Sequence, residues 1–251
     1  MLNPRYIIHT CADQTALSQA GAGYWLEQAQ QAIAQRGVFH VALTGGSTPQ
    51  SLYRLLARRE MADKVDWSCV HIFIGDERYV AHDHPDSNFA MAKDCLLDHV
   101  AIPDGNIHPV PTHYEHAREA AEQYADLLHA ILPATTGQAP QFDLIMLGMG
   151  EDGHTASLFP ATDILQEQDK TVAAVYVEKL ASWRVSMTYP TLNQARQVMV
   201  LVSGESKAGI LAHVLHKDSD AIYPIQAVLP VGEMHWFVDH AAAGKLDQSS
   251  S

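Results

Sequence analysis

The sequence has few cysteines and no long apolar run. Its three cysteines, Cys11, Cys69 and Cys95, are an odd number without a CxxC spacing, so neither a disulfide framework nor a cysteine zinc site is predicted. We expect reduced structural thiols. No window reaches about 18 uninterrupted apolar residues, and the first residues lack the basic start and apolar core of a signal peptide. These absences predict a cytoplasmic protein without a membrane partner.

Basic residues are also scarce. The chain has 16 Lys and Arg against 29 Asp and Glu, which gives a net charge of -13. Such a chain repels polyanions, so nucleic acid is not an expected partner, whereas a small phosphorylated ligand can bind where a few donors converge. A hydrophobic content of 47% and a charged content of 18% exclude a disordered chain or a coiled-coil rod and predict a soluble globular protein.

Histidine, in contrast, is abundant, with fifteen residues. The closest pairs are His82/His84, His113/His116 and His213/His216. None of these pairs has a strong metal-ligand spacing, and an HEXXH motif is absent. We therefore expect no metal site and interpret the histidines as surface or core residues.

No Pro/Ser-rich linker, repeat or charge block divides the 251 residues. Apolar runs bounded by turn residues cover 5–10, 37–46, 70–77, 142–150 and 197–204, and stretches with helical periodicity cover 15–36, 51–59, 115–132 and 205–216. This alternation predicts an α/β fold with a mainly parallel, twisted sheet and helices on both faces. Ligands then belong at the carboxyl ends of the strands. We expect one domain over 1–246 and a flexible tail over 247–251.

The first motif follows the apolar run 37–43 and reads Thr44-Gly45-Gly46-Ser47-Thr48-Pro49. Ser47 or Thr48 is a candidate helix cap, and Pro49 suits a first helical turn. The free backbone N–H groups and the helix dipole would together attract a phosphate. In isolation, a tight turn and a phosphate site are about equally good interpretations.

The second motif places Asp76, Glu77 and Arg78 at the end of an apolar run, with Asp86-Ser87-Asn88 opening another helix. Carboxylates are costly to bury unless they are paired or hydrogen-bonded, so this position suggests a site. Taken alone, the cluster fits a surface salt bridge better.

The third motif is the most specific. The run 142–147 ends in Gly148-Met149-Gly150 and is followed by Asp152-Gly153-His154. Histidine titrates near neutral pH, and a nearby carboxylate can orient it, so the pair is suited to general base catalysis.

Arg184 and Lys207 lie near Gly- and Ser-containing turns and are candidate phosphate ligands, although each taken singly is more typical of a solvated surface.

Together these segments resemble the 6-phosphogluconolactonase family, within the wider glucosamine-6-phosphate isomerase/deaminase superfamily. The matching motifs, in order, are TGGSTP at 44–49, GDER at 75–78, HPDSN at 84–88, GMGEDGHTASLFP at 148–160, RVSMTYPTLN at 184–193, SGESKA at 203–208 and YPIQAVLP at 223–230. The resemblance implies hydrolysis of 6-phosphoglucono-1,5-lactone to 6-phosphogluconate, a step of the oxidative pentose phosphate pathway, without a metal or organic cofactor.

The resemblance also implies roles for the residues. His154 would take a proton from the attacking water, Asp152 would orient His154, and Arg78 would stabilise the oxyanion. Asp76 and Glu77 would hold that neighbourhood in place.

The phosphate of the substrate would lie at the other end of the site. The implied phosphate-binding residues are Gly45, Gly46, Ser47, Thr48, Arg184 and Lys207. We expect a monomer that acts on a small phosphorylated lactone.

Two other functions compete with this interpretation, and the first is that of a glucosamine-6-phosphate deaminase or aldose-ketose isomerase. Deaminases that resemble this chain typically carry a glutamate just before the proline that ends the third motif, where this sequence has Phe159 before Pro160. Phenylalanine cannot transfer protons, so the lactonase is favoured. A non-catalytic sugar-phosphate sensor would need a DNA-binding module, and the acidic chain, with its first strand near residue 5, leaves no evident room for one.

Overall fold

A computed structural model of the chain describes residues 6–134, 138–216 and 223–246. The strands found there are β1 Tyr6–Cys11, β2 Phe39–Leu43, β3 Val70–Ile74, β4 Asp76–Arg78, β5 Ile107–His108, β6 Leu144–Gly148, β7 Val172–Val177, β8 Ser182–Met187, β9 Gln197–Val202 and β10 Glu233–Asp239. The α-helices are α1 Gln14–Arg36, α2 Ser47–Leu56, α3 Arg59–Ala62, α4 Asn88–Cys95, α5 Ala117–Ile131, α6 Tyr189–Asn193, α7 Ala208–Leu215 and α8 His240–Ala243. The tail predicted at 247–251 lies outside the described residues, and the domain boundary at 246 stays a prediction.

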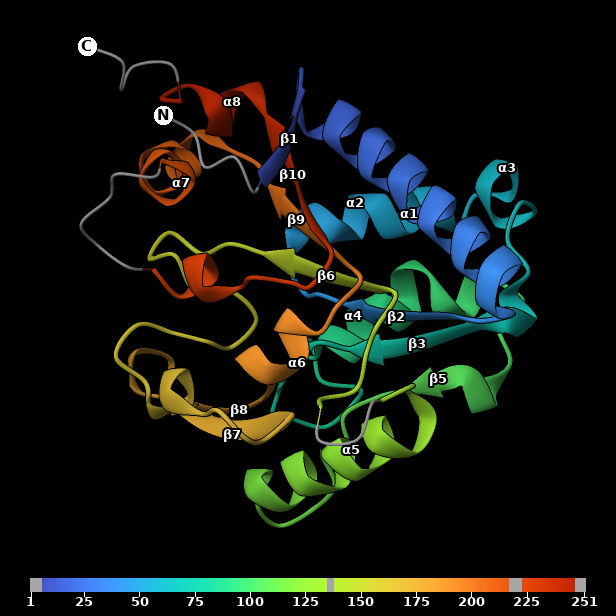
Figure 1. Cartoon of the computed structure of the whole chain (residues 1–251), viewed down its shortest axis with the longest axis vertical. Coiled ribbons are helices and arrows are strands. Elements are labelled where there is room, and N and C mark those ends of the chain that lie inside the picture. The colour runs from blue at the N-terminus through green and yellow to red at the C-terminus, as the bar shows by residue number, and fades with distance from the viewer. Residues whose placement is uncertain (1–5, 135–137, 217–222, 247–251) are drawn as a thin grey trace.

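The main sheet has seven parallel strands in the order β1-β10-β9-β6-β2-β3-β5 (Figure 1). The prediction of a mainly parallel sheet is therefore confirmed. From β2 the chain adds β3 and β5 in one direction, and from β6 it adds β9 and β10 in the other, so the order of the strands reverses between β2 and β6. In an open parallel sheet, this reversal leaves a crevice at the carboxyl ends of the two strands.

A second, antiparallel sheet has the order β4-β8-β7 and was not predicted. The run 70–77, which we expected to be one strand, breaks at Gly75 into β3 and β4. Gly75 N donates to Leu43 O at 2.9 Å within the parallel sheet, whereas Gly75 O accepts from Met187 N at 3.0 Å beside β8. The chain therefore leaves one sheet and enters the other at this residue.

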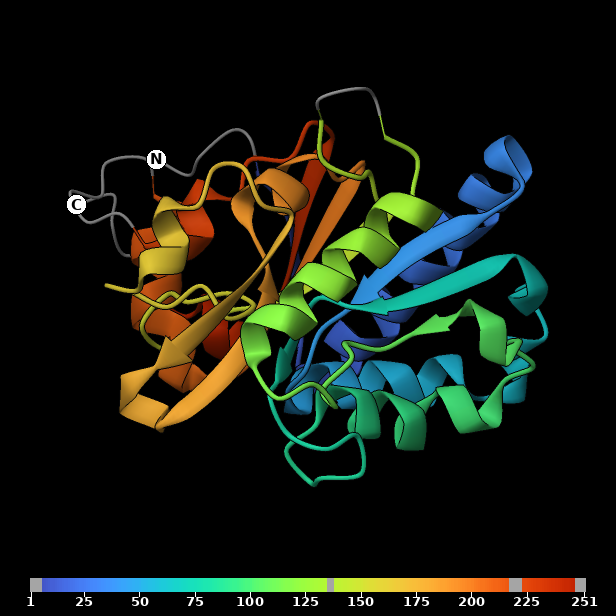
Figure 2. The ribbon, with the colours of Figure 1, turned by 90° about the horizontal axis from the view of Figure 1, so that it is seen from below.

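Helices cover both faces of the main sheet, as predicted. Helix α1 packs on α2, and α2 packs on α4, on one face, while α5 lies on the other face and packs against β7 and β8 (Figure 2). Side chains fix where several helices begin. The Asp13 carboxylate accepts from Ala16 N at 2.8 Å at the start of α1, and Ser87 Oγ accepts from Ala90 N at 3.1 Å at the start of α4.

The core lies between these layers. Every residue of β2 is buried, and β6 and β9 are buried over nearly their whole length, because central parallel strands are covered on both faces. No helix in the described part of the chain is long and apolar enough to cross a bilayer.

Candidate active site

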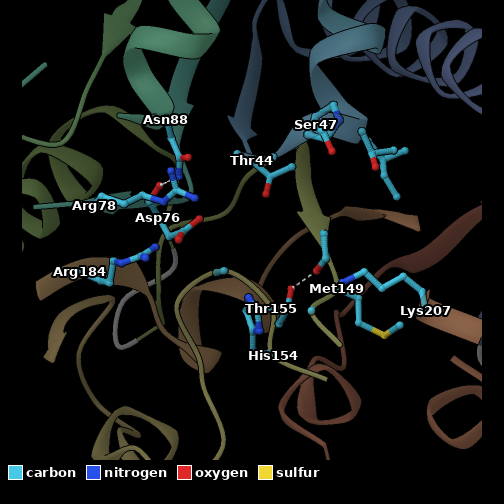
Figure 3. Close-up of a pocket in the computed structure, with 18 residues that line it drawn as sticks. Thr44, Ser47, Asp76, Arg78, Asn88, Met149, His154, Thr155, Arg184 and Lys207 are labelled. Carbon is cyan, nitrogen blue, oxygen red and sulfur yellow. Dashed lines mark hydrogen bonds between the residues drawn. The ribbon is translucent and has the colours of Figure 1, made fainter. Parts of the chain in front are cut away.

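A cavity of about 260 Å³ opens at the carboxyl ends of the central strands, where the strand order reverses (Figure 3). All predicted site residues except Asp152 and Glu77 line it, namely Gly45, Gly46, Ser47, Thr48, Asp76, Arg78, His154, Arg184 and Lys207. The structure thus gathers in one place residues that are up to 162 positions apart in the sequence, from Gly45 to Lys207.

The loop after β2 forms one side of the cavity. Gly46 has a φ of 106°, a left-handed conformation that favours glycine, and α2 begins at the next residue, Ser47. The expectation that Ser47 or Thr48 caps this helix is wrong, because Gly46 occupies the cap position and no side chain bonds the helix end. The first N–H groups of a helix have no partner within it, so they remain available to an anion in the cavity.

The loop after β6 carries His154 and Asp152. Asp152 Oδ1 accepts from His154 Nδ1 at 2.5 Å and from His154 N at 3.2 Å. An ionised carboxylate can only accept, so Nδ1 carries the proton of a neutral His154 and Nε2 is left unprotonated. The tightness of this loop requires Gly150, because a Cβ there would lie 2.0 Å from His154 Nδ1.

Two opposing influences set the charge of this pair. Burial lowers the pKa of His154 below its ordinary value, although Asp152 and Asp76 act in the opposite direction. Burial raises the pKa of Asp152, but hydrogen bonds from Lys179 and His154 outweigh it and hold that pKa well below its usual range. At neutral pH the site therefore contains an ionised carboxylate beside a neutral imidazole, which is the state a general base needs.

Strand β4 divides its residues between the cavity and the interior. Asp76 lines the cavity, and its Oδ2 accepts from Ser157 Oγ at 2.7 Å. Glu77 is fully buried on the other side of the strand and accepts from Asn88 N at 2.7 Å and Phe89 N at 2.8 Å, at the start of α4. Burial raises the pKa of Glu77, while these bonds lower it. Glu77 thus anchors α4 and does not line the cavity.

Arg78 and Arg184 occupy paired positions on the neighbouring strands β4 and β8. Arg78 Nη1 donates to Asp86 O at 2.5 Å, but the Nε atoms of both arginines are buried without a hydrogen-bond partner among the described residues. Burial, and then the neighbouring Arg78, lower the pKa of Arg184. Both arginines line the cavity, and two adjacent guanidinium groups there can attract negative charge.

Lys207 approaches from a different direction. It ends the 3₁₀ turn Glu205–Lys207 that follows β9 and precedes α7. Figure 3 shows Lys207 on the side of Ser47, and the two arginines together on the other side of His154. The cavity therefore has cations at both ends, with the histidine between them.

Several residues of the site escaped the sequence analysis. Ser157 lies within the third motif but shows no spacing that assigns it a role. Asn88 lines the cavity and donates from Nδ2 to Asp76 O at 2.7 Å. Lys179 forms an ion pair with Asp152 from the turn between β7 and β8, in a stretch without any motif. No sequence signal could have identified Lys179.

Three other histidines lie close together and do not line the cavity. His40, His71 and His108 lie on the neighbouring strands β2, β3 and β5, and His71 Nδ1 lies 3.1 Å from His108 Nε2. Burial lowers the pKa of both His40 and His108 to about 4. No group of three or more His, Cys, Asp or Glu in residues 6–134, 138–216 and 223–246 could hold a metal ion.

Comparison with known proteins identifies the family. The model of the family "Glucosamine-6-phosphate isomerases/6-phosphogluconolactonase" matches residues 12–236. A 6-phosphogluconolactonase of Nostoc sp. is 41% identical over 240 residues, which cover 95% of this chain and 98% of the relative. A 6-phosphogluconolactonase of Synechocystis sp. is 42% identical over 217 residues, which cover 86% and 88%. The chain belongs to the glucosamine-6-phosphate isomerase/6-phosphogluconolactonase family.

A solved structure from this glucosamine-6-phosphate isomerase/6-phosphogluconolactonase family has the same fold. The 6-phosphogluconolactonase of Trypanosoma brucei superposes with a TM-score of 0.86 at 30% identity, and the match covers 98% of this chain and 100% of that one.

Phe159, the residue on which the sequence-based preference for the lactonase rests, lies directly at the candidate base. The ring of Phe159 stacks on His154, with centroids 4.0 Å apart and planes 23° apart. A side chain without a titratable group therefore covers one face of the His154 ring.

Proposed function

We propose that this chain hydrolyses 6-phospho-D-glucono-1,5-lactone to 6-phospho-D-gluconate, with His154 as the general base. The chain is a lactone hydrolase by its family and by its 6-phosphogluconolactonase relatives. The observation that carries the residue assignment is the hydrogen bond from His154 Nδ1 to Asp152, which leaves Nε2 unprotonated beside a cavity with cations at both ends.

In the first step, His154 Nε2 takes a proton from a water molecule while the water oxygen attacks C1 of the lactone. A C–O bond forms, and the carbonyl electron pair becomes an oxyanion. Arg78 donates to this oxyanion, a role supported by its position in the lining of the cavity together with His154. The imidazolium that forms is stabilised by Asp152 and by Asp76, both of which favour the charged form of His154.

In the second step, the oxyanion collapses and the bond between C1 and the ring oxygen breaks. The imidazolium returns its proton to the departing ring oxygen, which becomes a hydroxyl group. The product is the open-chain acid, and His154 is neutral again. No group other than substrate and water is consumed.

The phosphate of the substrate is held at the loop after β2. The backbone of Gly45, Gly46, Ser47 and Thr48 supplies N–H donors. Lys207 supplies positive charge from the side of Ser47, and Arg184 supplies it from the opposite side of the cavity. Holding the phosphate positions C1 against His154, so part of the binding free energy contributes to the rate. We further propose that the protein acts as a monomer in the cytoplasm.

The test follows acid release from freshly prepared 6-phosphoglucono-1,5-lactone, above the spontaneous rate, in weak buffer with a chelator. Deamination of glucosamine 6-phosphate is measured in parallel. We expect lactone hydrolysis by the wild type and a decrease in kcat of about 10²- to 10⁴-fold for His154→Ala, because general base catalysis typically contributes that much. His129→Ala, which removes an exposed histidine of α5, is the matched control and should leave kcat unchanged.

Two results would contradict the proposal. Near wild-type kinetics for His154→Ala would eliminate the general base assignment. Deamination without lactone hydrolysis would eliminate the lactonase activity itself and would mean that Phe159 does not discriminate the two reactions.

A further inference from the structure

Among the described residues, Lys179 contacts both Asp152, which bonds to the His154 ring, and Phe159, which stacks on it. It lies in the 3₁₀ turn Glu178–Leu180 between β7 and β8. Its Nζ forms an ion pair with Asp152 Oδ2, the carboxylate oxygen that His154 does not use. The same Nζ lies 4.6 Å from the centroid of the Phe159 ring, which stacks on His154.

These contacts restrict the imidazole from two directions. Asp152 has two oxygens, and with Oδ2 bound to Lys179 the carboxylate cannot rotate without breaking that ion pair. Phe159 limits tilting of the imidazole, and the cation near its ring favours one position of that ring. Lys179 thus reaches His154 through both of its neighbours without lining the cavity itself.

Lys179 also acts on the charge of His154. Three charged groups shift the pKa of His154, namely Asp152 on its own loop, Asp76 on β4 and Lys179 on the β7–β8 turn. The other ionisable groups nearby are Arg78, Arg184 and Lys207, which line the cavity, and Tyr223, which lies against Gly153. The two carboxylates raise the pKa of His154, and Lys179 lowers it. Loss of Lys179 removes a repelling charge and leaves Asp152 less neutralised, and both changes raise the pKa of His154.

We propose that Lys179 is a positioning residue of the lactonase reaction, which orients the Asp152–His154 pair and keeps His154 in the neutral form that accepts a proton. This inference rests on the proposed function, since it assigns Lys179 a role only if His154 is the base. Lys179 is about half exposed, at 52%, and an exposed ion pair contributes little to stability. Its contribution to activity should therefore be separable from any contribution to folding.

The test compares the pH dependence of kcat/KM for the wild type, Lys179→Met, Lys179→Gln and Lys179→Arg. Lys170→Met, which removes an exposed lysine just before β7, is the matched control. Activity requires neutral His154, so it falls as the pH decreases through the pKa of His154. In Lys179→Met and Lys179→Gln we expect this acid limb to move upward by about 0.5 pH unit or more.

The kinetic constants give a second readout. We expect kcat to fall about tenfold in Lys179→Met, a fraction of what a positioned general base contributes, with KM for the lactone within about twofold of the wild type. Lys179→Arg should recover most of kcat and the wild-type acid limb, because arginine can also pair with Asp152. The melting temperatures of all variants and of Lys170→Met should agree closely.

The outcomes separate this inference from the proposed function. If His154→Ala removes activity but Lys179→Met and Lys179→Gln keep the wild-type acid limb and kcat, the role of Lys179 is wrong and the general base assignment stands. If His154→Ala itself keeps wild-type activity, the proposed function fails first. A loss of kcat in Lys179→Met without movement of the acid limb, together with a lowered melting temperature, would reduce Lys179 to a structural residue and overturn the inference.

Discussion

The two sheets build opposite parts of the cavity in different ways. The parallel sheet contributes loops that begin where strands end, with glycines that let the backbone turn sharply beside Ser47 and His154. The antiparallel sheet contributes side chains from the strands themselves and from one turn, namely Arg78, Arg184 and Lys179. In this chain the parallel sheet provides the base and the backbone donors, and the antiparallel sheet provides most of the charge that surrounds them.

This difference predicts that activity depends most on backbone shape in the loops of the parallel sheet. In Gly150→Ala the new Cβ would lie 2.0 Å from His154 Nδ1, so the imidazole must move. We expect kcat to fall about 10²-fold or more, since a displacement of about 1 Å can cost that much. Gly209→Ala, in α7 where a Cβ meets no atom within 4 Å, is the control and should keep the wild-type kcat. Equal kcat values for the two variants would mean that the shape of the loop does not position the base.

At the antiparallel sheet, activity should instead depend on the charge of the side chains. Steady-state kinetics can distinguish the roles of its two arginines. Arg78→Met should lower kcat about 10²-fold with little change in KM, because a donor to the oxyanion contributes roughly 3 kcal/mol in the transition state only. Arg184→Met should chiefly raise KM, by about tenfold, if Arg184 neutralises the phosphate in both ground and transition states. Steady-state kinetics on the lactone measure both constants.

Arg59→Met, which removes an exposed arginine of α3, is the matched control for both variants and should behave as the wild type. Because Arg184 lies beside Arg78 and across the site from Lys207, its role is the sharper question. A loss of kcat in Arg184→Met as large as that in Arg78→Met, with KM unchanged, would assign both arginines to the oxyanion and leave the phosphate to Lys207 and the loop.

The same contrast explains what could be predicted from the sequence. Strands β2, β6 and β9 are buried on both faces, so they appear as continuous apolar runs bounded by glycines. Strands β4 and β8 contain charged residues and show no such run. Strand β7 is an apolar run, VAAVYV, but no glycine bounds it, and its face is partly exposed. The motifs were visible because they follow the continuous runs.

The limits of prediction at the site have the same origin. Asp152 and His154 are two residues apart, so their pairing is a local property that the sequence shows directly. Lys179 reaches Asp152 across 27 residues, through a turn whose position depends on how the antiparallel sheet packs. The prediction of a cap at Ser47 or Thr48 was wrong because the left-handed Gly46 takes the cap position, so the helix already begins at Ser47. The cap preferences of serine and threonine do not reveal this earlier start.

The smallest effect on activity is expected within β4 itself, because neighbouring residues of a strand face opposite sides. Asp76 and Arg78 face the cavity, whereas Glu77 is buried and each of its oxygens accepts two hydrogen bonds, from the backbone of Arg78, Asn88 and Phe89 and from Ser87 Oγ. In Glu77→Gln the amide NH₂ must face donors at one of the two oxygen positions. We expect the free energy of unfolding at pH 7.5 to fall by about 2 kcal/mol, as for a buried donor left without a partner.

Chemical denaturation of Glu77→Gln and steady-state kinetics together test this separation. The exposed Glu60→Gln in α3 is the control and should be unchanged in both measurements. Because Glu77 touches the start of α4 and not the cavity, kcat of the folded Glu77→Gln protein should stay within about threefold of the wild type. A large loss of kcat with wild-type stability would show instead that the negative charge of Glu77 acts on the site through the strand. The buried face of β4 would then contribute to catalysis as well as to stability.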